Sequence, residues 1–126
     1  MGEIKSFRDL LVWQKGHELV IGIYKITKNF PDEERYNLVS QMRRAAVSII
    51  SNLVEGFRRR GVKDSLNFYN RADSSLEELK YQVLLSRDLI YISKEDFTNL
   101  NNKCEEVSRM LYSWIKSQRN NKKLNK

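Results

Sequence analysis

The chain has 126 residues, enough for one domain of ordinary size. Hydrophobic residues make up 40% of it, which supports a packed core and excludes an intrinsically disordered protein. One proline and five glycines leave few helix breakers, so the composition favours long helices.

Rare residue types exclude several kinds of site. Cys104 is the single cysteine, so the chain can form neither an internal disulfide nor a cysteine-based metal site. His17 is the single histidine, which argues against a zinc site built from histidines. We therefore expect no metal and no cofactor. No apolar stretch reaches the ~18 residues of a membrane span, and the charged first residues lack the apolar region of a signal peptide, so we expect a cytoplasmic protein.

The first predicted helix covers residues 7–29. Ser6 and Asp9 have the spacing of a capping box at its start. Pro31 is expected to end it, because the residue before a proline disfavours helical backbone angles. Residues 31–34 then form a predicted connector with an acidic start to the next helix.

The second predicted helix covers residues 36–60, with Gly61 as its C-terminal cap. The third covers residues 63–91. The fourth covers residues 94–118 and is predicted to be capped by Ser93. Cys104 lies in the apolar stripe of the fourth helix, so we interpret it as small core filler and not as a nucleophile.

Short connections make consecutive helices antiparallel neighbours. The sequence therefore predicts an all-α protein with an up-down-up-down antiparallel four-helix bundle over residues 1–119. Residues 120–126 are polar and basic, and we expect them to form a disordered tail. The second helix has an unusually wide apolar arc, which suggests that another copy of the protein covers part of it.

Polar residues in the second and third helices predict a seam between them. On a helical wheel they form one strip on each helix, and an antiparallel register sets Glu55 against Arg71, Ser48 against Ser75, and Arg44 against Glu78. Asn52 belongs to the same strip. The alternative is a solvated face of the second helix. A catalytic pair made of Glu55 and Glu78 is disfavoured, because a facing arginine would lower the pKa of each carboxylate.

Positive charge is concentrated in two segments. One is the end of the second helix and the start of the third, and the other is the end of the chain: Arg58, Arg59, Arg60 and Lys63; Lys116, Arg119, Lys122, Lys123 and Lys126. These nine side chains exceed the net charge of +7, so the rest of the chain carries −2. The topology brings both segments to one end of the bundle, near Lys5 and Arg8. Clustered cations indicate a polyanion partner, although basic tails also serve solubility.

The stretch SQMRRAAVSIISNLVEGFRRRG, followed by NFYNRADSSLEELKYQ, resembles the four-helix-bundle proteins encoded in intervening sequences of bacterial large-subunit ribosomal RNA genes. The most specific parts are residues 44–49, Asn52-x-x-Glu55-Gly56 and Ala72-x-x-Ser75-x-x-Glu78-Leu79. Ile50 stands where the family usually has proline, which implies a straighter second helix here.

The resemblance implies an up-down bundle that assembles into a ring of five subunits. The family's biochemical role is poorly defined. A related branch comprises basic accessory proteins of diversity-generating retroelements, which bind nucleic acid and associate with a reverse transcriptase.

Two functions follow as expectations. The first is a non-enzymatic, oligomeric protein that binds RNA or DNA through the phosphate backbone. Its predicted contacts are Arg58, Arg59, Arg60, Lys63, Lys116, Arg119, Lys122 and Lys123. The second is a protein-interaction scaffold or accessory subunit of a nucleic-acid enzyme, with Tyr36, Tyr91 and Trp114 as candidate anchors. An enzyme is not expected, because the chain has no glycine-rich phosphate loop and no nucleophile–base pair.

Overall fold

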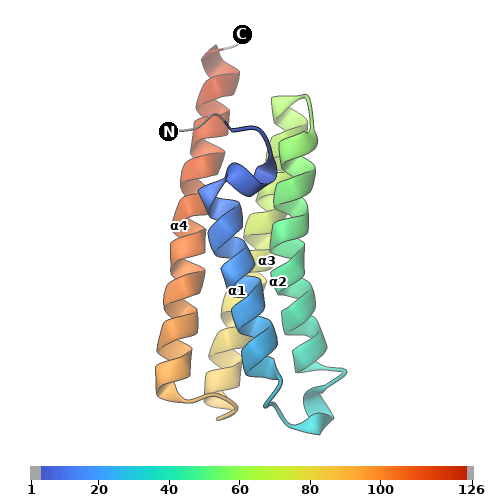
Figure 1. The fold of residues 1–126 in the computed structure, drawn as a ribbon, viewed down its shortest axis with the longest axis vertical. Coiled ribbons are helices and arrows are strands. Elements are labelled where there is room, and N and C mark those ends of the chain that lie inside the picture. The colour runs from blue at the N-terminus through green and yellow to red at the C-terminus, as the bar shows by residue number, and fades with distance from the viewer. Residues whose placement is uncertain (1–3, 125–126) are drawn as a thin grey trace.

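Four antiparallel helices form a single bundle in the computed structural model, which describes residues 4–124 and, for residues 122–124, the backbone alone (Figure 1). The helices are α1 (Leu11–Thr27), α2 (Leu38–Arg58), α3 (Val62–Asp88) and α4 (Lys94–Leu124). Consecutive helices pack against one another, and α1 closes the bundle against α4. The predicted fold class is confirmed.

A capped turn precedes α1 and delays its start. The Ser6 hydroxyl accepts a hydrogen bond from the Arg8 backbone, and the Asp9 carboxylate accepts from the Lys5 and Ser6 backbones at 2.8 and 3.1 Å. These two backbone bonds lower the pKa of the Asp9 carboxyl. The predicted capping box is confirmed, but it caps the 3-10 turn η1 (Phe7–Asp9). Leu10 is then extended and buried, so α1 begins at Leu11 and not at Phe7.

The connector between α1 and α2 contains the predicted acidic segment, folded as the 3-10 turn η2 (Asp32–Glu34) after Pro31. One Glu34 oxygen accepts a hydrogen bond from the backbone of Leu38, at the first residue of α2. The other accepts from the Tyr91 hydroxyl at 2.8 Å. This second bond ties the α1–α2 connector to the α3–α4 connector, at the end of the bundle away from the chain termini (Figure 1).

The α2–α3 hairpin differs from the prediction at Gly61. Helix α2 ends at Arg58, and Arg59 is extended. Gly61 has an ordinary φ of −85° and is the N-cap of α3, where its carbonyl accepts a hydrogen bond from Ser65 at 3.0 Å. The prediction of a C-terminal cap for α2 was wrong because the chain leaves the helix two residues earlier.

The α3–α4 connector is built on a left-handed residue. Helix α3 ends at Asp88, three residues before the predicted end. Ile90 has φ 61°, and it donates to the Arg87 carbonyl while Tyr91 donates to the Ser86 carbonyl, both at 2.9 Å. This pair of bonds is a Schellman motif, which usually has glycine at the position that Ile90 occupies.

Helix α4 starts as predicted and ends later. The Ser93 hydroxyl accepts from the Asp96 backbone at 3.0 Å, which confirms the predicted cap. The helix continues through Leu124, so the predicted end at Gln118 and the tail boundary at residue 120 are too early. No proline or glycine interrupts residues 119–124, and several of them favour helix. Residues 125 and 126 of the predicted tail lie outside the described residues.

The core is a continuous cluster contributed by all four helices, with its most buried side chains on facing stripes. Cys104 is fully buried in this cluster, as predicted, and burial raises the pKa of its thiol to about 12. Helix α2 packs against α1 and α3, and the turn η1 also contacts it, so part of its wide apolar arc is covered by η1. Val47 is the one large hydrophobic side chain of α2 that is exposed, so most of the wide apolar arc of α2 is covered within the chain.

Candidate nucleic-acid interface

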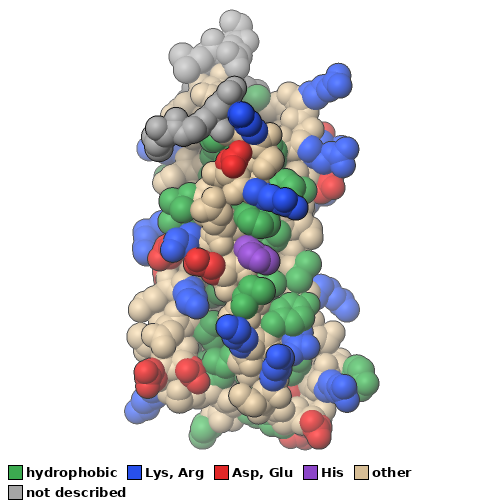
Figure 2. Space-filling view, in the orientation of Figure 1, with side chains coloured by type: hydrophobic (Ala, Val, Ile, Leu, Met, Phe, Trp, Pro, Cys, Tyr) green, Lys and Arg blue, Asp and Glu red, His purple; other side chains and the backbone are tan. Residues whose placement is uncertain are grey.

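The first basic segment lies where α2 turns into α3. Arg58, Arg60 and Lys63 are exposed and make no ion pair with another described residue. Figure 2 shows Lys and Arg side chains projecting along the edge of the molecule over this hairpin. These three cations are close together in the chain and none is paired with a carboxylate, so they would attract an anion.

Arg59 has a different role from its neighbours. Its guanidinium donates to Glu55 at 2.9 Å, lies 3.9 Å from the Asp64 carboxylate, and stacks over the Phe68 ring with 4.5 Å to the centroid. These contacts join the end of α2 to the start of α3. Arg59 is exposed like Arg58 and Arg60, but it differs from them because its charge is paired and it holds the hairpin.

The second basic segment lies beside the hairpin, as the topology predicts. The end of α4 and the α2–α3 hairpin share one end of the bundle (Figure 1). The Tyr69 and Trp114 rings are in edge contact with 6.0 Å between centroids, which sets the level of α3 against α4. Lys63 lies six residues from Tyr69 in the direction of the hairpin. Asn120 lies six residues from Trp114 in the same direction, because α3 and α4 are antiparallel. Arg119 is therefore near the level of Lys63.

Lys116 and Arg119 are exposed on α4 and make no ion pair with a described residue. They lie within about 60° of one another on the helix, toward the α3 side. The backbones of Lys122 and Lys123 continue α4, whereas their side chains lie outside the described residues. The exposed cations Lys5 and Arg8 belong to the segment that crosses this same end (Figure 1). The two basic segments thus form one basic end.

The predicted polar seam between α2 and α3 is present at its centre. The Ser48 and Ser75 hydroxyls are 2.9 Å apart, in the predicted register. Asn52 donates to the Ser48 carbonyl at 2.8 Å and to the Ser48 hydroxyl at 3.1 Å. All three side chains are half-buried. A small hydrogen-bonded network therefore fixes the register of the hairpin.

The predicted ion pairs on either side of this network do not form. Glu55 binds Arg59, four residues later and just past the end of α2, and the Arg71 guanidinium lies over the Phe68 ring at 4.9 Å. Arg44 makes no ion pair with a described residue, while Glu78 accepts from Gln82 at 3.3 Å. Partners four residues away in the chain lose less conformational freedom than partners across an interface, which explains why the local contacts prevail.

Another charged cluster, which the sequence reading missed, joins α3 to α4. The half-buried Lys80 ammonium lies 2.9 Å from Glu77, 3.4 Å from Glu105 and 3.1 Å from the Ser108 hydroxyl. Burial opposes the charged form, but these carboxylates together raise the pKa of Lys80. Lys80 sits between the apolar positions Leu79 and Val83, a spacing that could have marked it as a residue at the helix interface.

Two further features bear on chemistry and partners. Among the residues that the structure describes, no group of His, Cys, Asp and Glu could hold a metal ion. Within the same range no helix is long and apolar enough to cross a bilayer.

Of the candidate anchors, Tyr36 is 87% exposed, whereas Tyr91 and Trp114 are half-buried within the bundle.

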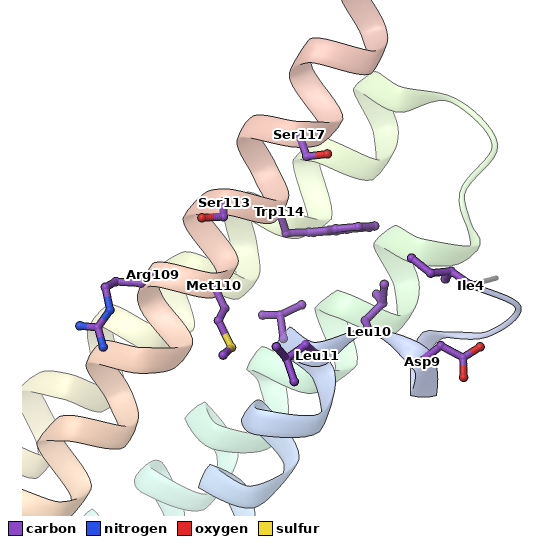
Figure 3. Close-up of a pocket in the computed structure, with 10 residues that line it drawn as sticks. Ile4, Asp9, Leu10, Leu11, Arg109, Met110, Ser113, Trp114 and Ser117 are labelled. Carbon is purple, nitrogen blue, oxygen red and sulfur yellow. The ribbon is translucent and has the colours of Figure 1, made fainter. Parts of the chain in front are cut away.

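An apolar groove lies beside the basic end, between the start of α1 and α4. Its volume is ≈ 430 Å³. Leu11 and Met110 point toward one another across it, and the Trp114 ring extends toward Leu10 and Ile4 (Figure 3). Leu11 is 56% exposed, which is high for a leucine in a helical bundle.

The family model described as 23S rRNA-intervening sequence protein matches residues 8–113. The chain belongs to this family. The matched range contains the seam and the arginine hairpin of this intervening sequence protein, but not Lys116 or Arg119. The resemblance predicted from the sequence is confirmed at the level of the family.

The fold of this intervening sequence protein is similar to a crystal structure of a protein of unknown function from the S23 ribosomal protein family of Bacteroides thetaiotaomicron VPI-5482. The two chains are 27% identical, with a TM-score of 0.78 over 84% of this chain and 96% of that one. No curated protein matches the sequence.

Proposed function

We propose that this intervening sequence protein is a non-enzymatic protein that binds RNA or DNA through phosphate contacts at its basic end. The observation that carries the proposal is the placement of exposed cations from three parts of the chain at one end of the bundle, without carboxylate partners among the described residues. Phosphate contacts position a protein on nucleic acid without reading sequence. We therefore expect weak sequence preference.

Salt dependence tests this proposal, because each phosphate contact releases condensed counterions. The variant carries Arg58→Gln, Arg60→Gln and Lys63→Gln. Its control removes the same charge from three exposed lysines at the opposite end: Lys25→Gln, Lys28→Gln and Lys94→Gln. Binding of structured RNA and of duplex DNA is measured by fluorescence anisotropy over a salt series.

The basic-end variant should lose affinity, and the slope of log K against log salt should fall in magnitude by roughly 2 to 3. The control variant should keep both the affinity and the slope. Equal losses in the two variants would mean that net charge and not the basic end drives binding. An unchanged slope in the basic-end variant would refute the proposed contacts.

Self-association is the second part of the proposal. The support is the apolar groove beside the basic end, since an exposed Leu11 next to Met110 and Trp114 is apolar surface that a second subunit would cover. The ring of five subunits expected from the family resemblance stays a prediction. Assembly would repeat the basic end once per subunit and so raise the avidity for long nucleic acid.

A scaffold or accessory-subunit function is the alternative, and exposed side chains at the opposite end favour it. Ile90 is 86% exposed and Leu89 is 44% exposed, next to one another in the α3–α4 connector. Protein binding through these residues would resist salt and be weakened by Leu89→Asn. Binding of nucleic acid would respond to salt and not to that substitution.

A further inference from the structure

A second groove runs between the end of α1 and the start of α2, at the opposite end from the arginine hairpin. Its volume is ≈ 510 Å³. Three arginines and two tyrosines line it, together with Val39, Ser40 and Val47: Arg35, Arg43, Arg44, Tyr24 and Tyr36. No carboxylate is among the lining residues. In the lower right of Figure 2, Lys and Arg side chains lie among hydrophobic ones over this part of the molecule.

Arg43 is fixed in the groove by contacts that leave its charge uncompensated. Its Nε donates to the Thr27 hydroxyl at 3.0 Å, and its Nη2 donates to the Tyr24 carbonyl at 3.3 Å. The guanidinium also lies 4.7 Å from the centroid of the Tyr24 ring. Every one of these partners is neutral. The groove thus holds a preorganised cation, and placing it needs little further ordering when an anion binds.

Arg44 and Tyr36 supply the adaptable parts of the groove. Arg44 is exposed and makes no ion pair with a described residue. The Tyr36 side chain is 87% exposed, and the Arg35 guanidinium lies 5.8 Å from the centroid of its ring. Among the neighbouring acidic residues, Glu34 is bonded to Tyr91 and to the Leu38 backbone. Asp32 lines the adjacent pocket together with Arg35 and Arg43 but makes no ion pair with either of them.

We infer that this groove is a binding site for unpaired nucleotides, in which the arginines contact phosphates and a base stacks on Tyr36. Cationic grooves with exposed aromatic rings bind single strands because phosphates meet the cations and bases meet the rings. A paired base in a duplex offers no free face for stacking. The site therefore distinguishes single-stranded from double-stranded nucleic acid, which the arginine hairpin does not.

A second copy of the chain fits the groove less well. It would have to bring carboxylates to three arginines, and Val47 is the one exposed aliphatic side chain beside the two tyrosines in the groove. The groove is also distant from the arginine hairpin. Arg44 and Arg58 are fourteen residues apart on α2, or about 21 Å along the helix. The two sites can therefore be tested separately.

The test measures binding of fluorescein-labelled oligouridylate and oligothymidylate of about ten nucleotides, and of a blunt duplex of the same length. The variants are Tyr36→Ala, Tyr36→Phe and Arg44→Gln. Tyr81→Ala is the matched control, since Tyr81 is 60% exposed on α3 and lies outside the groove. Light scattering on each variant reports its molar mass.

Tyr36→Ala should weaken binding of single strands by roughly 5- to 100-fold and leave duplex binding unchanged. Tyr36→Phe should retain affinity, because the ring is kept, and Tyr81→Ala should match the wild type. Arg44→Gln should weaken binding and reduce its salt dependence. Comparison of the RNA and DNA strands shows whether the 2′-hydroxyl contributes.

The inference is overturned if Tyr36→Ala binds single strands as tightly as wild type, or if it weakens single strands and duplex equally. A fall in molar mass on Arg44→Gln would also overturn it, since the groove would then be an interface between copies. In the variant that lacks Arg58, Arg60 and Lys63, the Tyr36-dependent difference between strand and duplex should persist. Failure of the proposed basic-end contacts is thereby distinguished from failure of this groove.

Discussion

Gly56 of α2 lies directly against the ring of Tyr69 of α3. A Cβ atom on Gly56 would be 2.5 Å from Tyr69 Cε1 and 2.8 Å from Cδ1. Tyr69 is 2% exposed and its ring also contacts the Trp114 ring, so it has little room to move. The absence of a side chain at Gly56 therefore sets how closely α2 approaches α3 near the basic end.

Gly56→Ala should destabilise the protein by about 1 to 3 kcal/mol, as overpacking of a filled core does. Gly22→Ala is the control, because Gly22 is also inside a helix but its nearest contact would be an ordinary 3.8 Å. Alanine there should stabilise α1 by about 0.5 to 1 kcal/mol. Urea unfolding followed by circular dichroism gives both values. Equal stability changes in the two variants would contradict the close-approach explanation.

Ile90 adopts a left-handed conformation that costs a β-branched residue about 1 to 2 kcal/mol. Ile90→Gly should recover about 1 kcal/mol of stability, because its side chain is 86% exposed and contributes little burial. Leu89→Gly serves as the comparison, since Leu89 has an ordinary φ of −82° and should gain nothing. Thermal unfolding of the two variants decides the matter, and a loss of stability in Ile90→Gly would show that the isoleucine side chain makes a needed contact.

Cys104 should be unreactive in the folded protein. Burial raises the pKa of its thiol to about 12, so the reactive thiolate is scarce near neutral pH. Because the folded pKa lies above the unfolded value, the stability contribution is complete below the unfolded pKa of about 8.5 and declines as pH rises toward 12. A thiol reagent at pH 8 should label the native chain slowly and the urea-unfolded chain fast. Rapid native labelling would place the thiol outside the core.

The apolar groove predicts self-association that depends on Leu11. Light scattering of the wild type should give a molar mass that is a multiple of the 15.0 kDa chain. Leu11→Gln should lower that mass without unfolding the protein, because Leu11 is already more than half exposed. Tyr112→Gln provides the control on α4, outside the groove, and should assemble like the wild type. A monomeric wild type would show that a second copy of the chain does not bind in this groove.

The sequence predicts the bundle well because the bundle depends on apolar periodicity, which survives small errors in helix ends. The Ser48–Ser75 contact was also predictable, since two short side chains at one level of an antiparallel pair have few other partners. The partners of long charged side chains were not predictable in this way. Glu55 can reach a cation four residues later in the chain as well as one across the interface, and the wheel positions alone do not rank the two.

Backbone conformation at the turns was the other source of error. Glycine usually marks the left-handed residue after a helix, yet here Gly61 is the N-cap of α3 and Ile90 takes the left-handed position. The arginine–tyrosine groove was missed because its residues come from α1, the connector and α2. Arg35 and Arg43 carry no signal of their own in the sequence, and Arg44 was assigned to the polar seam; only the fold places Tyr24 in the same groove.

Helix α4 has 31 residues and its neighbour α1 has 17, a difference of about 20 Å along the helix axis. The final turns of α4 consequently have fewer packed neighbours than its middle, and helical hydrogen bonds with little tertiary support open more often. Amide hydrogen exchange should therefore be graded along α4, slow around Cys104 and fast after Arg119. A ligand that occupies the basic end would suppress the fast exchange first, long before it changes the global unfolding equilibrium.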